Sequence, residues 1–351
     1  MEQNTQKRFS ASWTNLVKRR EDWEGQSGLL GNLDLAVHDI HVGLKMARSV
    51  LIGTHEHPDG DALGSALALM HVLRLQGKEV TVFAPDPAPE MFKFLPGIEQ
   101  VVYGVPPDPS LFDVVVLLDS TTTERVHLDG LIESHPLTIC IDHHVHDTYQ
   151  CKLNLIVPEA AATAHILTEF FNKTNTPITK DVATCLLTGI FTDTGSFMHD
   201  STSPEILKLA AALMGKGARL SHIAHETYQK KELPGLKIWG RALSRIMMNE
   251  KTGATVSIIT ADDLAECGAT LDDLAGVVNM LNTLPETKFA LLLTEYEKGK
   301  IKGSLRSEPH KGVDVSVIAK KFGGGGHKLA AGFEVVGHLV ESDGKWRVVA
   351  P

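Results

Sequence analysis

The turn at residues 54–65 combines residue types that could do chemistry. It reads T-H-E-H-P-D-G-D-A-L-G-S and places His55, Asp59 and Asp61 within seven residues. One imidazole and two carboxylates in a tight turn can hold one divalent metal ion or two adjacent ones. With no thiolate among them, these donors favour Mn²⁺ or Mg²⁺ over structural zinc, although softness alone does not exclude zinc or iron. The alternative interpretation is that Asp61 caps the following helix, while His55 and Asp59 are ordinary loop residues.

Two further apolar runs end in residues of the same kind. Residues 112–120 read F-D-V-V-V-L-L-D-S and end with Asp119, whose simpler interpretation is a helix cap. Residues 137–144 read L-T-I-C-I-D-H-H and deliver an aspartate and two histidines: Asp142, His143 and His144. Parallel strands bring such residues to one carboxyl edge of a sheet. Adjacent histidines point in different directions, so one can bind metal while the other faces substrate.

A fourth segment, residues 188–197, reads T-G-I-F-T-D-T-G-S-F and places Asp193 after an apolar helix. Its glycines, Gly189 and Gly195, would let another backbone come close. Four separated segments therefore supply six candidate metal ligands: His55, Asp59, Asp61, Asp119, His143 and Asp193. This set matches a two-metal hydrolytic site in which one carboxylate bridges the ions.

The elements that must position these residues alternate between strand and helix. Strands are predicted at residues 49–53, 79–84, 114–119, 137–142 and 153–157. Helices are predicted at residues 33–47, 61–76, 126–135, 159–172 and 180–192. Short, nearly continuous apolar strands separated by helices indicate an α/β fold with a doubly wound, mainly parallel sheet.

The rest of the chain divides around this catalytic domain, predicted at residues 33–200. Residues 1–32 form a polar N-terminal arm, residues 201–232 a helical linker, and residues 233–351 a smaller α/β domain that binds substrate. In the smaller domain we expect helices near residues 234–249, 271–282 and 313–322. Strands are expected near residues 254–260, 288–296 and 300–306.

Composition excludes several classes of protein. The 351 residues are 43% hydrophobic, which suits a globular protein of two domains. The four cysteines form no C-x-x-C pair, and no run suggests a signal peptide or a membrane span, so we expect a cytoplasmic protein without membrane contact. The net charge of −9 argues against a track for long nucleic acid.

Positive charge gathers in one stretch, residues 300–330. It contains two acidic residues and seven basic ones: Lys300, Lys302, Arg306, Lys311, Lys320, Lys321 and Lys328. The stretch also contains the run G-G-G-G-H at residues 323–327, whose unobstructed N–H groups could cradle a phosphate. The simpler interpretations are solvated lysines and a flexible loop.

The four segments resemble the four signature motifs of the DHH phosphoesterase superfamily. They read H-E-H-P-D-G-D-A-L-G-S, V-V-L-L-D-S, I-D-H-H and T-G-I-F-T-D-T-G-S-F. The stretches G-S-L-R-S at residues 303–307 and F-G-G-G-G-H-K-L-A-A-G-F at residues 322–333 resemble its DHH-associated C-terminal domain. Within the superfamily the chain is most similar to the short two-domain NrnA-type enzymes, which act as oligoribonucleases and as phosphatases on 3′-phosphoadenosine 5′-phosphate (pAp).

The resemblance implies two manganese ions, for which Mg²⁺ or Co²⁺ could substitute. It implies one ion on His55, Asp59 and Asp119 and the other on Asp61, Asp119, His143 and Asp193, with Asp119 as the bridge. It further implies that Asp142 orients a histidine and that His144 contacts the scissile phosphate. The implied substrate contacts are Arg306, Ser307, Gly324, Gly325, Gly326, His327 and Lys328.

The expected function is hydrolysis of oligonucleotides of roughly two to five nucleotides to mononucleotides, and of pAp to AMP. A hydroxide bridging the metals would attack phosphorus in line. The nearest rival is a cyclic di-AMP or pApA phosphodiesterase, and a rival of another class is a non-catalytic nucleotide-binding regulator. RecJ-type exonucleases share the core but carry additional nucleic-acid-binding segments. Short oligonucleotides or nucleotide phosphates are the expected partners, and a homodimer is one expected assembly.

Overall fold

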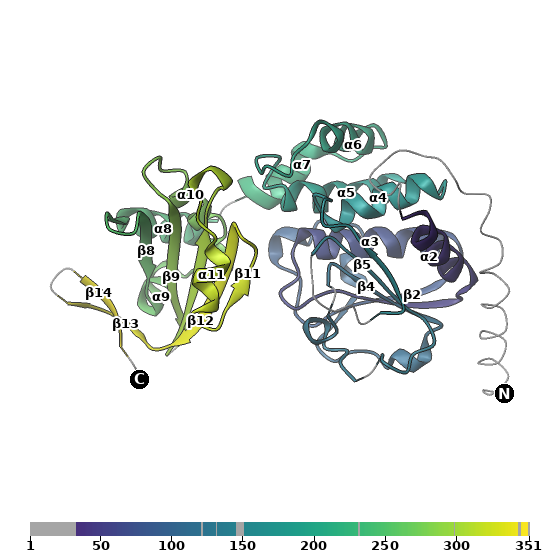
Figure 1. Cartoon of the computed structure of the whole chain (residues 1–351), viewed down its shortest axis with the longest axis horizontal. Helices are drawn as coiled ribbons and strands as arrows, with labels where there is room; N and C mark the ends of the chain where they lie inside the picture. Colours follow the sequence, from purple (N-terminus) through teal and green to yellow (C-terminus); the bar gives the residue numbers. More distant parts are fainter. Residues whose placement is uncertain are drawn as a thin grey trace. The chain divides into compact units, whose positions relative to one another are not determined.

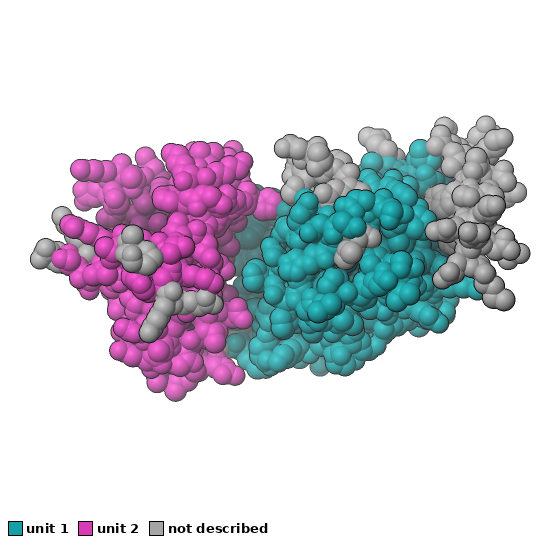
Figure 2. All heavy atoms as spheres, turned by 90° about the horizontal axis from the view of Figure 1, so that it is seen from below, with its two compact units in different colours: residues 1–230 teal, residues 231–351 magenta. Residues whose placement is uncertain are grey.

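The computed structural model describes residues 33–120, 122–130, 132–144, 151–230, 232–297, 299–342 and 345–349. The arm expected at residues 1–32 lies outside this description. The chain forms two compact units, residues 1–230 and residues 231–351, which are coloured separately in Figure 2. Within the described residues, no helix combines the length and the apolar character needed to cross a bilayer.

Six parallel strands form the sheet of unit 1, in the order β3-β2-β1-β4-β5-β6. Their bounds are β1 Ser49–Gly53, β2 Glu79–Ala84, β3 Val101–Tyr103, β4 Val114–Leu118, β5 Thr138–Asp142 and β6 Leu153–Ile156. Every residue of β4 and β5 is buried, as expected for parallel strands covered on both faces. The predicted α/β fold with a mainly parallel sheet is confirmed.

Helices cover one face of this sheet and enclose the main core (Figure 1). Their bounds are α2 Asp34–Met46, α3 Gly60–Leu75, α4 Thr163–Lys173 and α5 Lys180–Asp193. α3 is buried along almost its whole length, which agrees with its nearly continuous apolar sequence. α3 and α5 pack directly against each other, and both take part in the site described below.

The helix predicted at residues 126–135 is wrong. The structure has a 3₁₀ turn at Glu124–Val126, followed by bends. His127 and Gly130 have φ angles of 55° and 70°, which a right-handed helix cannot contain. The apolar side chains that suggested a helix still serve the core, because Val126 and Leu128 are buried against the second face of the sheet.

The linker was predicted at residues 201–232, but residues 204–229 are largely helical and belong to unit 1. They form α6 Pro204–Gly215, α7 Leu220–Ala224 and a π-helical turn at His225–Gln229. Ile206, Leu213 and Ile223 are buried in the main core. This packing, absent from a solvated linker, is the reason that the boundary between the units falls after Lys230.

Unit 2 contains a mixed sheet in the order β11-β12-β10-β9-β8-β7 and a separate hairpin of β13 and β14. The strands are β7 Met247–Asn249, β8 Ala254–Ile259, β9 Phe289–Glu297, β10 Lys300–Arg306, β11 Gly325–Gly326, β12 Ala330–Val336, β13 His338–Ser342 and β14 Lys345–Val349. The helices are α8 Leu233–Ser244, α9 Ala261–Cys267, α10 Val277–Asn282 and α11 Val315–Lys320.

Three features of unit 2 differ from prediction. α8 ends at Ser244, five residues early, because β7 pairs with β8. α10 begins only after Gly276, whose φ of 91° breaks the helix predicted from residue 271. α9 and the strands from β12 onward were not predicted.

Candidate active site

The carboxyl ends of β1 and β4 are the point from which the site is built. The two strands are neighbours, and the winding of the sheet reverses between them. Open α/β sheets place their sites beyond the strand ends at such a reversal. His55 follows β1 and Asp119 follows β4, and their side chains meet there, with His55 Nε2 3.3 Å from Asp119 Oδ2.

The contact between α3 and α5 brings further carboxylates to this point. A Cβ atom on Gly64 would lie 2.5 Å from the Cys185 carbonyl oxygen, and one on Gly189 would lie 2.6 Å from Asp61 Oδ1. Both distances are shorter than any tolerated contact, so only glycine allows this approach. The close contact that Gly189 was predicted to allow is therefore with Asp61, in the first turn of α3.

All six predicted metal ligands come together. Two groups of three residues each have donor atoms within 4.8 Å of one another: His55, Asp59 and Asp119, and Asp61, His143 and Asp193. A third group contains Asp119, Asp142, His143 and His144. Asp119 belongs to two groups, and His143 Nε2 lies 3.6 Å from Asp119 Oδ1 and 3.5 Å from Asp193 Oδ2.

Asp119 is the central carboxylate and adopts an unusual backbone conformation. Its φ is 58°, in the left-handed region, and only 2% of the residue is exposed. Aspartate and asparagine tolerate this region better than most residues, but holding it costs free energy. The Thr163 hydroxyl donates to Asp119 Oδ1 at 3.0 Å, and His144 Nδ1 lies 3.5 Å from the same oxygen.

The hydrogen bonds of two histidines fix which ring nitrogen carries the proton. His55 Nδ1 lies 2.6 Å from the Glu56 carbonyl oxygen, which can only accept, so Nδ1 donates and Nε2 is left as the donor atom for a metal. His144 Nδ1 donates to Asp142 Oδ1 at 2.7 Å, and the backbone N–H of His144 donates to the same oxygen at 3.0 Å. Asp142 therefore orients His144.

Two aspartates of the turn at residues 54–65 cap different helices. Asp59 Oδ1 accepts the backbone N–H groups of Asp61 and Ala62 and so caps α3. Asp61 accepts the N–H groups of Thr163 and Ala164, at 2.6 Å and 2.9 Å, and caps α4. The alternative in which Asp61 caps its own helix is wrong, because that cap is Asp59.

The burial of several carboxylates in one place has an electrostatic consequence. Burial, followed by the Asp59 charge, raises the pKa of Asp61 from 3.8 to about 7. Burial, followed by the Asp61 charge, raises the pKa of Asp119 and of Asp193 well above the ordinary range. Divalent cations would replace the protons that this cluster otherwise binds, because they neutralise the same charge.

Two residues of the site were missed by the sequence analysis. Burial is the strongest influence on the pKa of His55 and of His144 and lowers both, and the positive charge of Arg125 acts in the same direction. Only in His144 does the neighbouring Asp142 reverse the outcome and raise the pKa. Thr163 is fully buried and contacts Asp61 through its backbone and Asp119 through its hydroxyl. A threonine in an apolar helix gives no signal of such a role in the sequence.

Comparison with known proteins agrees with this geometry. The family model for the N-terminal domain of the DHH family matches residues 49–190, and the DHHA1 domain model matches residues 250–342. The bifunctional oligoribonuclease and PAP phosphatase NrnA of Thermus thermophilus is 33% identical over 82% of this chain and 84% of its own length. The chain belongs to the DHH family of phosphoesterases.

Two further relatives span most of this DHH phosphoesterase. The bifunctional oligoribonuclease and PAP phosphatase NrnA of Bacillus subtilis is 25% identical over 82% of this chain and 89% of its own length. The crystal structure of an exopolyphosphatase-related protein from Bacteroides fragilis superimposes with a TM-score of 0.77 at 25% identity. That comparison covers 85% of this chain and 90% of the other.

The donors of this DHH site fit divalent metal ions. Imidazole nitrogens and carboxylate oxygens surround the shared Asp119, with no thiolate in the three groups found among the described residues. Asp59 and His55 each keep an atom for a metal, since the hydrogen bonds to Asp59 use one oxygen and the bond from His55 uses Nδ1. Both oxygens of Asp61 accept backbone N–H groups, so Asp61 would bind a metal through a remaining lone pair. A divalent-metal requirement, as is general in DHH phosphoesterases, therefore suits these residues.

The residues predicted to bind substrate lie together in unit 2. Arg306 ends β10 and pairs with Ala330 of β12, and β12 pairs in turn with β11. His327 and Lys328 follow β11 and are exposed. Ser307 is buried, and its hydroxyl donates to the Lys288 carbonyl oxygen, so this side chain fastens the end of β10 to the start of β9.

The glycine run is a strand edge in the structure. A Cβ on Gly324 would lie 2.1 Å from the Gly332 carbonyl oxygen, and one on Gly326 would lie 2.6 Å from that of Ala330. These two glycines are therefore required by close packing against β12. Gly325 lies between them, and a Cβ atom there would have no neighbour within 4 Å, so this position leaves room for a ligand.

Metal binding at this site should depend on pH. A carboxyl whose pKa is raised by folding favours the folded state at low pH, so the metal-free protein should lose stability as pH rises from about 4 to about 7. Mn²⁺ should restore this stability, raising the melting temperature by about 5 °C more at pH 8 than at pH 5.5. Thermal unfolding with Mn²⁺ and with chelator tests this, and an equal shift at both pH values would contradict it.

Proposed function

We propose that this phosphoesterase hydrolyses oligonucleotides of roughly two to five nucleotides to mononucleotides, and pAp to AMP, with two Mn²⁺ ions. The observation that carries the proposal is that two donor groups lie side by side, because Asp119 of the first group is 3.6 Å from His143 Nε2 of the second. The names of the Thermus and Bacillus relatives support the substrates. Four buried free cysteines support a reducing cytoplasm.

The chain's own residues would then have separate tasks. His55, Asp59 and Asp119 would hold one ion, and Asp61, His143 and Asp193 the other, with Asp119 shared. When bound, the ions supply positive charge for the phosphoryl oxygens and an activated water as nucleophile. Burial lowers the pKa of His144, but the hydrogen bond and charge of Asp142 raise it overall, so His144 would be an imidazolium that donates its Nε2–H to the scissile phosphate.

Unit 2 would contribute substrate binding through its basic segment. Arg306 ends β10 and presents a guanidinium that can bind a terminal phosphate through two parallel hydrogen bonds. The open position at Gly325 lies on β11, and His327 and Lys328 lie in the turn between β11 and β12. We propose these residues as the anchor for one end of the substrate.

A substrate panel tests the proposed activity. It contains pAp, pApA, cyclic di-AMP and single strands of two to about twenty-four nucleotides. The protein has one proposed basic anchor and a net charge of −9, so the additional phosphates of a longer strand gain little affinity. We therefore expect kcat/KM to be more than about tenfold lower for strands longer than five nucleotides than for dinucleotides. Undiminished cleavage of long strands would indicate a RecJ-like enzyme, and preferential cleavage of cyclic di-AMP would support the nearest rival.

The anchor is tested separately by Arg306→Ala. We expect KM to rise by about tenfold for dinucleotides and less for pentanucleotides, because the anchor is a larger share of binding in the shortest substrate. Lys237→Ala removes an exposed positive charge from α8 of the same unit and should leave KM unchanged. Equal effects of the two substitutions on KM would show that Arg306 is not the substrate anchor.

A further inference from the structure

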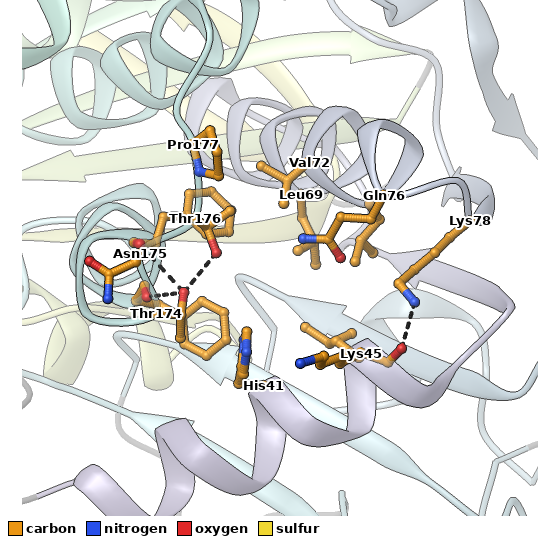
Figure 3. Close-up of a pocket in the computed structure, with 14 residues that line it drawn as sticks. His41, Lys45, Leu69, Val72, Gln76, Lys78, Thr174, Asn175, Thr176 and Pro177 are labelled. Carbon is orange, nitrogen blue, oxygen red and sulfur yellow. Dashed lines mark hydrogen bonds between the residues drawn. The ribbon is translucent and has the colours of Figure 1, made fainter. Parts of the chain in front are cut away.

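A cavity lies at the C-terminal ends of α3 and α4, two helices whose N-terminal ends lie at the candidate active site. It has a volume of about 340 Å³ and is lined by α2, the last turns of α3 and α4, and residues 174–177 (Figure 3). Asp61 stands in the first turn of α3 and Gln76 ends that helix, which separates them by about 22 Å at 1.5 Å per residue. The cavity is therefore distinct from the candidate active site.

The walls of the cavity are apolar and partly aromatic. Leu69 of α3 and the rings of Phe170 and Phe171 of α4 form a closely packed apolar lining, and each of these side chains is at most 2% exposed. The His41 ring lies 6.4 Å from the Phe170 ring, at 57° to it. The half-buried His41 ring therefore offers a ligand the flat surface that the buried phenylalanines do not.

The polar groups of the cavity are all basic or neutral. None of the described lining residues is Asp or Glu, whereas His41, Lys45 and Lys78 all take part. Lys78 Nζ donates to the carbonyl oxygens of Lys45 and Ala47, at 2.9 Å and 2.6 Å, which holds its charge in place. In a chain of net charge −9, this concentration of positive charge favours an anion.

His41 and Gln76 add hydrogen-bonding capacity. In Figure 3 their side chains lie on opposite sides of the cavity, with Lys45 next to His41. Burial, followed by the charges of Lys45 and His38, lowers the pKa of His41, so the empty site presents a neutral imidazole. The amide of Gln76 offers a donor and an acceptor side by side, the pattern that matches the edge of adenine.

We propose that this cavity binds a nucleoside monophosphate. The base would lie against the His41 ring with its edge at Gln76, and the phosphate would lie at Lys45. A volume of 340 Å³ is at the lower end of the range for small-ligand sites, which suits a mononucleotide rather than a dinucleotide. The proposal does not depend on the substrates proposed above.

The test uses the full-length chain with AMP as the probe and chelator present, so that no metal holds AMP at the active site. Calorimetry should show AMP binding, with adenosine and inorganic phosphate each binding at least about tenfold more weakly. Lys45→Glu should weaken AMP binding by about tenfold or more, since it reverses a charge at the phosphate. Lys208→Glu makes the same change at an exposed position of α6 and should alter binding less than twofold.

Photolabelling with 8-azido-AMP locates the bound nucleotide. The proposal expects label in residues 41–45 or 170–177, lost in Lys45→Glu and retained in Lys208→Glu. Label confined to the segments around His55, Asp119 or His143 would overturn it, as would equal binding by both variants. Turnover of Lys45→Glu on dinucleotides should equal that of the wild type, and a failure of the substrate panel would leave the binding result standing.

Discussion

Replacing Asp119 by asparagine should reduce turnover by at least about a thousandfold and lower the bound metal, because this carboxylate belongs to one donor group and lies beside His143 of the other. Asparagine keeps the shape of the side chain and tolerates the left-handed backbone of this position, where φ is 58°. Asp119→Ala should also abolish turnover, but alanine is strained in that conformation, which would confuse lost chemistry with lost stability. The measurements are steady-state kinetics, metal content and thermal unfolding.

Asp86→Asn is the matched control for this substitution. Asp86 follows β2, at the same carboxyl edge of the sheet, and accepts a hydrogen bond from the His57 backbone at 2.8 Å. It belongs to none of the three donor groups among the described residues. Wild-type activity and metal content in the purified Asp119→Asn protein would refute the shared-ligand assignment.

The sequence predicted which of these residues come together because parallel strands have a simple geometry. A buried apolar run that ends in a polar residue delivers that residue to the carboxyl edge, and this rule alone places His55, Asp119 and Asp142 together. Asp61 and Asp193 lie on helices, and their meeting depends on the contact at Gly64 and Gly189. That contact is a property of tertiary packing, which no local pattern states.

Other features were hidden because one residue type serves several purposes. An aspartate beside a helix start can cap it, cap another helix or bind metal, and only the structure shows that Asp61 caps α4 while it faces Asp193. Glycines can form a flexible loop or a tight strand edge, and Gly324 and Gly326 prove to be of the second kind. Apolar spacing in residues 126–135 suggested a helix, but burial under the sheet produces the same spacing without one.

His143→Ala and His144→Ala should fail in different ways. His143 Nε2 lies between Asp119 and Asp193, so its loss should weaken binding of one metal ion by about 10- to 100-fold. His144 is held by Asp142 through Nδ1, so its loss should spare metal content and lower kcat by about 100-fold or more. Metal titration by calorimetry and kinetics at saturating Mn²⁺ separate the two effects.

A high Mn²⁺ concentration should separate the defects of His143→Ala and His144→Ala most clearly. Excess Mn²⁺ should restore part of the turnover of His143→Ala, since its defect is metal occupancy, and should restore none in His144→Ala, whose defect lies in contact with the phosphate. His222→Ala, which removes a histidine of α7 that lies outside the donor groups found among the described residues, should behave as the wild type. Equal metal loss in the first two variants would show that both histidines are ligands and that the phosphate contact belongs to another residue. Arg125 would then be a cationic candidate for that contact, because its charge acts on both His55 and His144.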